Sequence, residues 1–493
     1  MEIIYSSKPL LAVMTSVFVI PILLSCRNSN IRETWTFIAG FIKLLIIVSM
    51  LPVVLAGKQP AITIYEVLPG LALQFRVDAF GLLFAIVASF LWIITSAYSI
   101  GYMRGLKEHS QTRYFCFFAL SLSATIGVAF SGNLLTMYLF YEMLSFSTYP
   151  LVTHHQDREA RSSGRMYLVY ILGPSIGFVL PAMLISYHMS GTLEFAVQGF
   201  LPDQGNYTGL LVLLLLFIFG FAKAGIMPFH SWLPAAMVAP TPVSALLHAV
   251  AVVKVGVFCV ARVMTGVFGT KLLASFELNT VICWIASITV ITSSLIALSQ
   301  DGLKRRLAFS TIGQLSYIVL GIALLSRSGM EGGMLHIAMH AFGKITLFFC
   351  AGAIFVATGV KNISEMKGIG KRMPITMAAF FIGSLSVIGL PPCGGFISKW
   401  LLLMGTVQAG QYVMLAVLLT SSLLSGAYFL PIVYNAFFCK PGNNTFQGGI
   451  QEAPAWCVVP LSVTAMFSIL LFFYPQPFLQ LSRVAVDSFL GGP

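Results

Sequence analysis

Five lysines and one glutamate lie inside stretches that otherwise have the composition of membrane-spanning helices. They are Lys43, Lys223, Lys254, Lys344, Lys399 and Glu142. A charged side chain near the middle of a bilayer costs at least ~2.5–3.5 kcal/mol on insertion scales, and such residues usually mark ion or proton pathways. Because desolvation favours the neutral form of lysine, a lysine in this setting can release and regain a proton near neutral pH. The set therefore predicts a path for protons.

The position of Lys43 sets it apart from the other lysines. In "FIKLLIIVSM" it lies near one end of its span, where its long side chain can reach the interface, so a structural role is favoured. The other four are more central and have polar neighbours, which favours a functional role. Glu142, in "LTMYLFYEMLSFSTYPLV", would favour the charged form of Lys223, and its movement or screening would release that proton. Contact between Glu142 and Lys223 is a hypothesis at this point.

Two of the lysines follow or precede proline-containing interruptions. Lys223 precedes "AGIMPFHSWLP". Lys399 is the second-last residue of "GLPPCGGFISKW" and follows the prolines and glycines of that stretch. Proline cannot continue an ordinary helix, and a broken helix is tolerated at membrane depth only where protein or water solvates the freed backbone. Two such breaks in corresponding places predict internal repeats with functional sites beside the breaks. The prolines concerned are Pro228, Pro234, Pro391 and Pro392.

A third polar group lies in "MLHIAMHAFGKITLFFC". His336, His340 and Lys344 have i, i+4, i+8 spacing, which places them on one face of a helix about 6 Å apart along its axis. A single buried histidine is more often a satisfied core residue, but a stripe of two histidines and a lysine favours proton transfer. His248, on "PTPVSALLHAV", begins the helix that carries Lys254 and is expected to connect two sites.

The composition makes the chain an integral membrane protein. Of its 493 residues, 58% are hydrophobic and only 9% are charged, and a soluble protein of this size could not bury so much apolar surface. Apolar segments of about 20 residues favour helices over a β-barrel. We expect fourteen spans, at about 8–25, 35–56, 78–102, 112–131, 132–153, 165–188, 209–228, 242–267, 277–299, 307–327, 332–359, 374–390 continuing through 396–408, 411–438 and 453–474.

The segments between the spans add a topology and a domain plan. "ITIYEVLPGLALQFRVD" predicts a small hairpin outside the bilayer, and no hydrophilic stretch is long enough for a soluble domain. Sixteen loop lysines and arginines fall on one side and seven on the other, which places both termini outside the cytoplasm. The expected units are an N-terminal part with three helices and the hairpin, two five-helix repeats, and a C-terminal helix with a tail. Their bounds are 1–111, 112–267, 268–438 and 439–493.

Neither cofactor nor metal binding is expected from the motifs. The eight cysteines are scattered and form no CxxC pair, which argues against an iron–sulfur or zinc centre. No nucleotide loop, flavin site or haem attachment motif is present. The net charge of +12 comes mostly from short loops, which is how membrane topology is signalled, so nucleic acid is not an expected partner.

Several motifs together resemble a known family. "YLFYEMLSFSTYPLV", "GFAKAGIMPFHSWLPAAMVAPTPVSALLHAVAVVKVG", "LKRRLAFSTIGQLSYIVLG", "HIAMHAFGKITLFFCAGAI" and "GLPPCGGFISKW" are similar to the antiporter-like subunits of respiratory complex I, membrane-bound hydrogenases and Mrp-type cation/proton antiporters. The resemblance covers roughly residues 75–435. It implies an all-α polytopic membrane protein of fourteen helices, two inverted five-helix repeats with discontinuous helices 7 and 12, and a central hydrophilic axis for protons.

The resemblance also implies roles for individual residues. Glu142 and Lys223 match the fifth-helix glutamate and its seventh-helix lysine partner, and Lys254 matches the connecting lysine of helix 8. Lys344 with its preceding histidines matches the eleventh-helix site, and Lys399 the twelfth-helix position, where some branches carry glutamate. An Mrp D-like or hydrogenase-type subunit is favoured by the lysine at position 399, by the chain length and by the missing long lateral helix. The stretch "YPLVTHHQDREARSSGR" departs from the Mrp D pattern.

Three functions are compatible with these patterns. The first is a proton-translocating subunit of a multisubunit Mrp-type monovalent cation/proton antiporter in the inner membrane of a prokaryote, held among other membrane subunits and lipids. Because the spans offer one carboxylate, Na⁺ would be handled elsewhere in the complex. The second is a proton-pumping subunit of a complex I-like NADH:quinone oxidoreductase or a membrane-bound hydrogenase, whose redox chemistry would belong to other chains. The third is a structural membrane scaffold.

Overall fold

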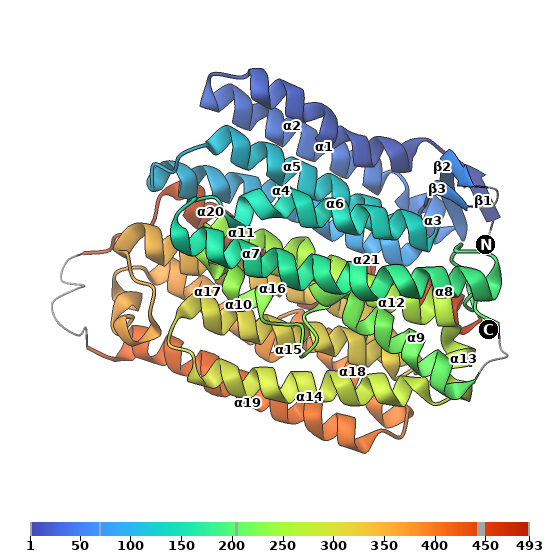
Figure 1. Ribbon diagram of the computed structural model, residues 1–493. Coiled ribbons are helices and arrows are strands. Elements are labelled where there is room, and N and C mark those ends of the chain that lie inside the picture. Colours follow the sequence, from blue (N-terminus) through green and yellow to red (C-terminus); the bar gives the residue numbers. More distant parts are fainter. Residues whose placement is uncertain (1, 69–70, 203–205, 441–448, 492–493) are drawn as a thin grey trace.

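The structure is a computed structural model that describes residues 2–68, 71–202, 206–440 and 449–491, without the side chains of Leu68 and His248. Most helices lie side by side along one direction, as a membrane bundle requires (Figure 1). In the described part, eleven helical segments are long and apolar enough to cross a membrane. Two further apolar helices are shorter because each stops at a break. The predicted total of fourteen stays a prediction.

The N-terminal part of the bundle consists of regular helices and a small sheet. Strand β1 (Glu2–Tyr5) pairs in parallel with β2 (Lys58–Leu68), which pairs antiparallel with β3 (Leu71–Arg76). The predicted hairpin is confirmed, while β1 was not foreseen. The helices are α1 (Lys8–Ser25), α2 (Ser29–Val48), α3 (Leu51–Leu55), α4 (Ala79–Gly105), α5 (Gln111–Ala129) and α6 (Leu134–Val152).

The middle of the chain is irregular at several points within the bundle. A π-helical turn η1 (Ser175–Val179) joins α7 (Arg158–Pro174) to α8 (Leu180–Ser190). Helix α9 (Tyr207–Gly220) then stops, and a 3-10 turn η2 (Ala222–Ala224) carries the chain into the break. Beyond the break lie α10 (Trp232–Ala235), η3 (Ala236–Val238), α11 (Thr241–Ala245), the π-helical turn η4 (Leu246–Val250), α12 (Val252–Arg262), η5 (Val263–Phe268) and α13 (Gly269–Ser275).

The second half repeats the alternation of long helices and one break. Between α17 (Pro374–Ile388) and α18 (Gly395–Gln408) the chain turns at the predicted proline pair. The amphipathic helix α21 (Gln476–Leu490) was not predicted. The other elements are α14 (Leu278–Ser299), α15 (Leu303–Ala323), α16 (Arg327–Thr358), the short 3-10 turns η6 (Ile363–Glu365) and η7 (Ile369–Lys371), α19 (Tyr412–Phe438) and α20 (Ala455–Phe473).

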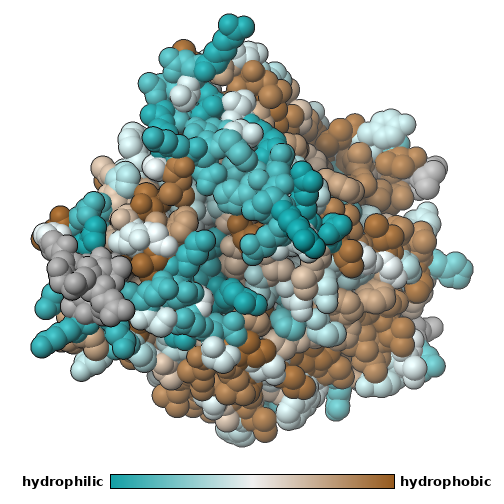
Figure 2. All heavy atoms as spheres, turned by 60° about the vertical axis from the view of Figure 1, so that its left-hand side comes forward, coloured by the Kyte–Doolittle hydropathy of each residue, from teal (hydrophilic) through white to brown (hydrophobic). Residues whose placement is uncertain are grey.

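The two ends of the bundle differ in polarity. Both termini lie at the same end, on the right of Figure 1. Figure 2 brings the opposite end forward and shows hydrophilic residues gathered there, with hydrophobic residues around them. Helices α12 and α16 form the buried centre: every residue of α12 is buried, whereas α1, α2 and α19 expose large apolar side chains on one side. Polar groups on α12 and α16 are therefore shielded from lipid by other helices.

Candidate functional site

Lys223 lies at the first helix break, fully buried in the 3-10 turn η2. Its Nζ donates to the main-chain oxygen of Tyr141 at 2.9 Å and to Ser145 Oγ at 2.6 Å, and it lies 3.1 Å from the centre of the Tyr141 ring. The carbonyl of Ala222, freed where the helix stops, accepts a hydrogen bond from Trp232 Nε1 at 3.0 Å. The break is thus stabilised by a side chain of its own motif, and it presents the lysine to α6.

Glu142 and Lys223 do not touch. Among the described residues, no carboxylate oxygen lies within 4.0 Å of Lys223 Nζ, and the sequence hypothesis of direct contact is wrong for this conformation. Ser145 lies between them, because its Oγ accepts from Lys223 and lies 3.4 Å from Glu142 Oε2, to which it can donate. Glu142 is half-buried, and its buried Oε1 has no hydrogen-bond partner in the described part of the chain. The carboxylate and the ammonium are linked through one hydroxyl.

Lys254 lies in the centre of the bundle and contacts the second half of the chain. Its buried Nζ is 2.8 Å from His340 Nδ1 on α16. The helix leading to it is interrupted by the π-helical turn η4 and a bend at Ala251, where φ is −105° and ψ −80°. Such π-turns occur frequently at functional sites. No proline or glycine lies between residues 243 and 255 to mark this interruption, and the predicted span 242–267 is not one regular helix.

Gly256 allows α12 to approach the Lys223 turn closely. A Cβ at this position would lie 2.1 Å from the nitrogen of Ala224 and 2.2 Å from the carbonyl carbon of Lys223. Real Cβ atoms do not approach backbone so closely, so only glycine permits this packing. Lys254 precedes Gly256 by two residues on the same helix. The glycine therefore holds the Lys254 helix directly against the first break.

The side chains of α16 that share one face follow each other as their spacing predicts. The rings of His336 and His340 are stacked with centroids 5.6 Å apart. His336 Nδ1 is 2.8 Å from Ser398 Oγ, and its Nε2 is 3.1 Å from Gln314 Oε1. His340 Nε2 is buried and has no hydrogen-bond partner among the described side chains and main-chain groups. One turn further along, Lys344 is buried as well.

Lys344 contacts a hydroxyl network on the neighbouring helices. Its Nζ donates to Ser310 Oγ at 2.8 Å, and the hydroxyl of Tyr428 lies 3.1 Å from the same oxygen. Ser425 Oγ lies a further 3.0 Å from that hydroxyl. Sequence reasoning missed these partners. Ser310 and Gln314 were detectable, because they lie at i, i+4 on one face of a predicted membrane span. Nothing comparable marks Tyr428.

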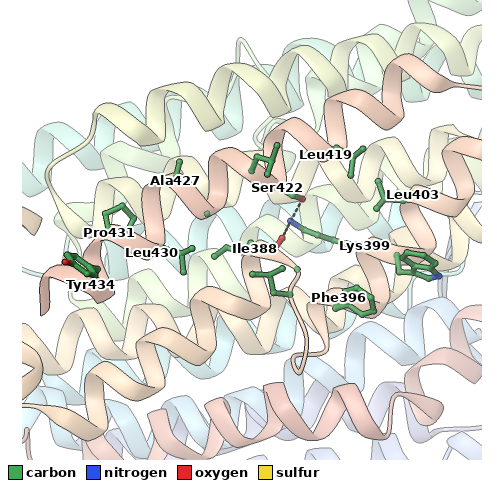
Figure 3. A pocket seen from close by; sticks show the side chains of 15 residues that line it. Ile388, Phe396, Lys399, Leu403, Leu419, Ser422, Ala427, Leu430, Pro431 and Tyr434 are labelled. Atoms are coloured by element: carbon green, nitrogen blue, oxygen red, sulfur yellow. Dashed lines mark hydrogen bonds between the residues drawn. The ribbon is translucent and has the colours of Figure 1, made fainter. Parts of the chain in front are cut away.

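Lys399 lies at the second break and at the base of a pocket (Figure 3). Its Nζ donates to the carbonyl of Ile388, the last residue of α17, at 3.0 Å and to Ser422 Oγ at 3.2 Å. The pocket has a volume of about 760 Å³, lies between α18 and α19, and is lined mainly by apolar side chains such as Leu403 and Leu430. Lys399 also lies 4.7 Å from the centre of the Tyr317 ring.

Two predicted residues lie apart from this chain of contacts. Lys43 is completely buried rather than extended to the interface, because its Nζ donates to Ser16 Oγ at 2.6 Å and lies 5.1 Å from the Trp92 ring. The snorkelling expectation is wrong, yet these partners are not members of the predicted axis. His248 belongs to η4, and its side chain lies outside the described part.

The four predicted break prolines fall in irregular or short segments. Pro228 follows η2 in the turn that leads to α10, and Pro234 lies within α10 itself. Pro391 and Pro392 occupy the turn between α17 and α18. All four therefore lie where the chain departs from long regular helix, as their chemistry predicts.

A polar pocket of about 1030 Å³ opens at the hydrophilic end of the bundle shown in Figure 2. Its wall comes from the C-terminal part of α4, the start of α7, the segment after the first break and the start of α15. The charged and histidine side chains that line it are Glu108, His155, Asp157, Glu159, His230, Lys304, Arg305 and Lys361. Neither its acidic nor its histidine residues were singled out from the sequence.

Comparisons with known proteins agree with this arrangement. A profile described as "NADH:quinone oxidoreductase/Mrp antiporter, TM" matches residues 131–425. The chain is 32% identical over 409 residues to NADH-quinone oxidoreductase subunit N of Desulforudis audaxviator, covering 78% of this chain and 79% of that protein. It is 29% identical over 437 residues to Na⁺/H⁺ antiporter subunit A1 of Staphylococcus aureus, covering 82% of this chain but 53% of the relative. The chain therefore spans about half the length of that antiporter subunit.

Two solved structures share the fold. A chain of the Mrp complex from Dietzia sp. DQ12-45-1b superposes with a TM-score of 0.86 over 98% of this chain and 97% of that chain, at 22% identity. A chain of the membrane-bound sulfane sulfur reductase, an archaeal respiratory membrane complex, gives a TM-score of 0.87 at 26% identity, covering 98% of each chain. At 22% identity the first likeness concerns the fold alone.

Proposed function

Since the chain belongs to the NADH:quinone oxidoreductase/Mrp antiporter family of membrane subunits, we propose that it carries protons along its buried polar axis as a subunit of a multisubunit Mrp-type cation/proton antiporter. The proposed route runs from the Glu142, Ser145 and Lys223 group to Lys254. It continues along the α16 face to Lys344 and ends near Lys399. The antiporter name comes from a relative, and the axis geometry supports a proton as the transported ion.

The observation that carries this proposal is the contact of Lys254 Nζ with His340 Nδ1 at 2.8 Å. A hydrogen bond of this kind needs an unprotonated acceptor, so a charged lysine faces a neutral imidazole, or the reverse after transfer. Two positive charges at this distance would repel by about 6 kcal/mol at an effective dielectric constant near 20. The pair therefore holds one excess proton more readily than two, and a second proton arriving on one side favours release on the other.

The same geometry explains why the two halves of the chain are needed. Lys254 comes from α12, and His340 comes from α16. The first break precedes α12 and the second follows α16. One break therefore falls in each of the proposed repeats, 112–267 and 268–438, which supports that assignment. Lys254 then connects the first break to the histidine stripe of the second half.

The test replaces the central lysine in the intact complex. Lys254→Met keeps the side-chain volume but removes the proton carrier, and we expect proton transport in inverted membrane vesicles to fall by at least about tenfold, the lower range for loss of a proton-transfer group. Lys43→Met is the matched control, since it removes an equally buried lysine outside the axis. Equal transport by the two variants, at equal amounts of assembled complex, contradicts the proposal.

A second function is favoured by the relative named NADH-quinone oxidoreductase subunit N, which matches this chain over 79% of its own length. In that case the same axis would pump protons driven by redox chemistry in partner chains. The two functions differ in what drives transport. A Na⁺ or K⁺ gradient imposed on vesicles should drive proton movement through an antiporter, whereas a pump requires electron flow through its partners.

The surroundings of the chain follow from the same proposal. The basic loops are expected to face the cytoplasm of a prokaryote and both termini the outside, which is consistent with the two termini sharing one end in Figure 1. Other membrane subunits and lipids would cover the exposed apolar sides. Na⁺ would bind elsewhere in the assembly, because Glu142 is the one carboxylate among the described residues of the proposed route.

A further inference from the structure

Three histidines and a glutamate converge at the hydrophilic end of the bundle. Glu108 and His109 lie in the connection between α4 and α5, and His154 and His155 follow the end of α6. Potential ligand atoms of Glu108, His109 and His154 all lie within 4.8 Å of one another. His155 Nδ1 adds a fourth, 3.5 Å from Glu108 Oε2. The cluster combines residues about 45 positions apart in the chain, as ligand sites built from two loops do.

His154 is a buried histidine with unsatisfied ring nitrogens. Its side chain is completely buried, and within the described part of the chain neither ring nitrogen has a hydrogen-bond partner. Buried polar groups are almost always hydrogen-bonded, so two orphaned nitrogens on one ring require an explanation. Its Nε2 lies 3.8 Å from Glu108 Oε2, close to the carboxylate but outside hydrogen-bond range. The ring is held by neighbouring rings, with centroids 4.9 Å from His109 and 6.1 Å from Tyr114.

We propose that Glu108, His109 and His154, with His155 as a further ligand, bind a divalent transition-metal ion, with Zn²⁺ as the best fit. Imidazole and carboxylate together suit zinc, whereas Mg²⁺ and Ca²⁺ prefer oxygen ligands alone. Ligand atoms around a tetrahedral zinc lie about 3.4 Å apart, given Zn–N distances of ~2.0–2.1 Å. Atoms separated by up to 4.8 Å reach that geometry by inward movements of roughly 0.7 Å each.

The environment is compatible with a cation. Arg113 Nη2 is held by the main-chain oxygen of His154, to which it donates at 2.9 Å. Asp157 and Glu159 line the adjoining pocket and add negative charge. The sequence expectation of no metal site considered cysteines and overlooked these histidines.

A metal ion bound by the cluster would lie beside the polar pocket and would affect the access of protons to it. Glu108 and His155 also line the polar pocket of about 1030 Å³. A divalent cation bound there would neutralise the acidic wall and oppose the approach of protons to the bundle from this side. This consequence rests on the proposed transport function, whereas the binding itself does not.

The experiment measures binding of the metal alone to the purified intact complex in detergent after treatment with a chelator. Equilibrium dialysis with Zn²⁺ and elemental analysis should show one Zn²⁺ fewer per complex in His109→Ala, or a Kd raised by at least roughly tenfold. His109 is exposed, so this variant is expected to fold, and Glu108→Gln removes a second ligand with little change in shape. His188→Ala, at an exposed histidine of α8, is the matched control and should bind as the parent does.

Co²⁺ provides an independent reading of geometry, since tetrahedral Co²⁺ with histidine ligands gives strong visible bands that Zn²⁺ should abolish by competition. If the parent complex and His109→Ala hold the same amount of Zn²⁺ with the same affinity, the site does not exist. If Zn²⁺ binds as expected but transport by the parent is unaffected, the metal site stands and protons do not use this pocket. Inhibition by Zn²⁺ that disappears in His109→Ala supports both.

Discussion

Replacing Gly256 with alanine tests whether the close packing of α12 against the first break sets the proton path. The added Cβ would lie 2.1 Å from the nitrogen of Ala224, whereas packed heavy atoms are about 3.5 Å or more apart. The helix or the turn must therefore retreat by roughly 1.4 Å. The obstructing atoms are backbone, so no side-chain rotation relieves the clash.

The displacement acts on the contact that the proposal depends on. Lys254 Nζ is 2.8 Å from His340 Nδ1, and a shift of about 1 Å in the position of α12 disrupts the geometry of this direct hydrogen bond. Misplacement by 1 Å can lower the rate of a positioned chemical step by about a hundredfold. Overpacking of this kind also costs roughly 1–3 kcal/mol of stability, which a large membrane bundle can tolerate.

The assay compares proton transport in vesicles with the amount of assembled complex. We expect Gly256→Ala to assemble at reduced but measurable levels and to transport at least about tenfold more slowly per complex. Gly173→Ala, on α7, is the matched control, because nothing lies within 4 Å of a Cβ built there. Transport per complex equal to that of the parent would show that the spacing between the first break and α12 does not limit proton transfer.

Two further substitutions test the lysine ranking and the stability of the α4 start. Lys399→Glu should lower transport more than Lys43→Met, since an ionised carboxylate would face the carbonyl oxygen of Ile388 instead of donating to it; vesicle transport by both variants checks this, and equal losses would argue against a role at the second break. Asp78→Asn should destabilise the complex by about 3–5 kcal/mol, because it leaves the buried guanidinium of Arg262, the ion-pair partner of Asp78, without a compensating negative charge. Thermal unfolding measures this against Glu2→Gln, which removes one partner of an exposed ion pair and should leave the midpoint unchanged.

The positions of the functional lysines could be predicted from the sequence because the membrane makes them conspicuous. A charge such as Lys254 in a run of valines is costly in lipid, and a proline pair such as Pro391 and Pro392 must end a helix. These signals are local, so they can be recognised without knowing how the helices pack. The hairpin between α3 and α4 was also predictable from a local signal, because its residues alternate between apolar and polar and include turn-forming residues.

Partners in space could not be predicted, because they depend on distances that the sequence does not encode. The expected contact between Glu142 and Lys223 is replaced by a link through Ser145. Serine is common in membrane helices, so its presence at position 145 did not indicate this role. The side chain of Lys43 was expected to reach the interface because the residue lies near the end of its span. Its ammonium instead stays buried, because it donates a hydrogen bond to the hydroxyl of Ser16. The π-helical turn before Lys254 likewise arises from packing, with no breaker residue at Ala251.

The chemistry of the lysine partners explains how a buried ammonium can serve as a carrier. In the part of the chain that the structure describes, each ammonium of the axis contacts neutral side chains rather than a carboxylate. The nearest are Ser145 for Lys223, His340 for Lys254, Ser310 for Lys344 and Ser422 for Lys399. A direct buried ion pair would hold its proton, since removing one partner costs about 3–5 kcal/mol. A hydroxyl accepts from a charged lysine and donates to a neutral one, and imidazole also has both roles. Such partners are suited to both protonation states, so a proton can leave without stranding a buried charge.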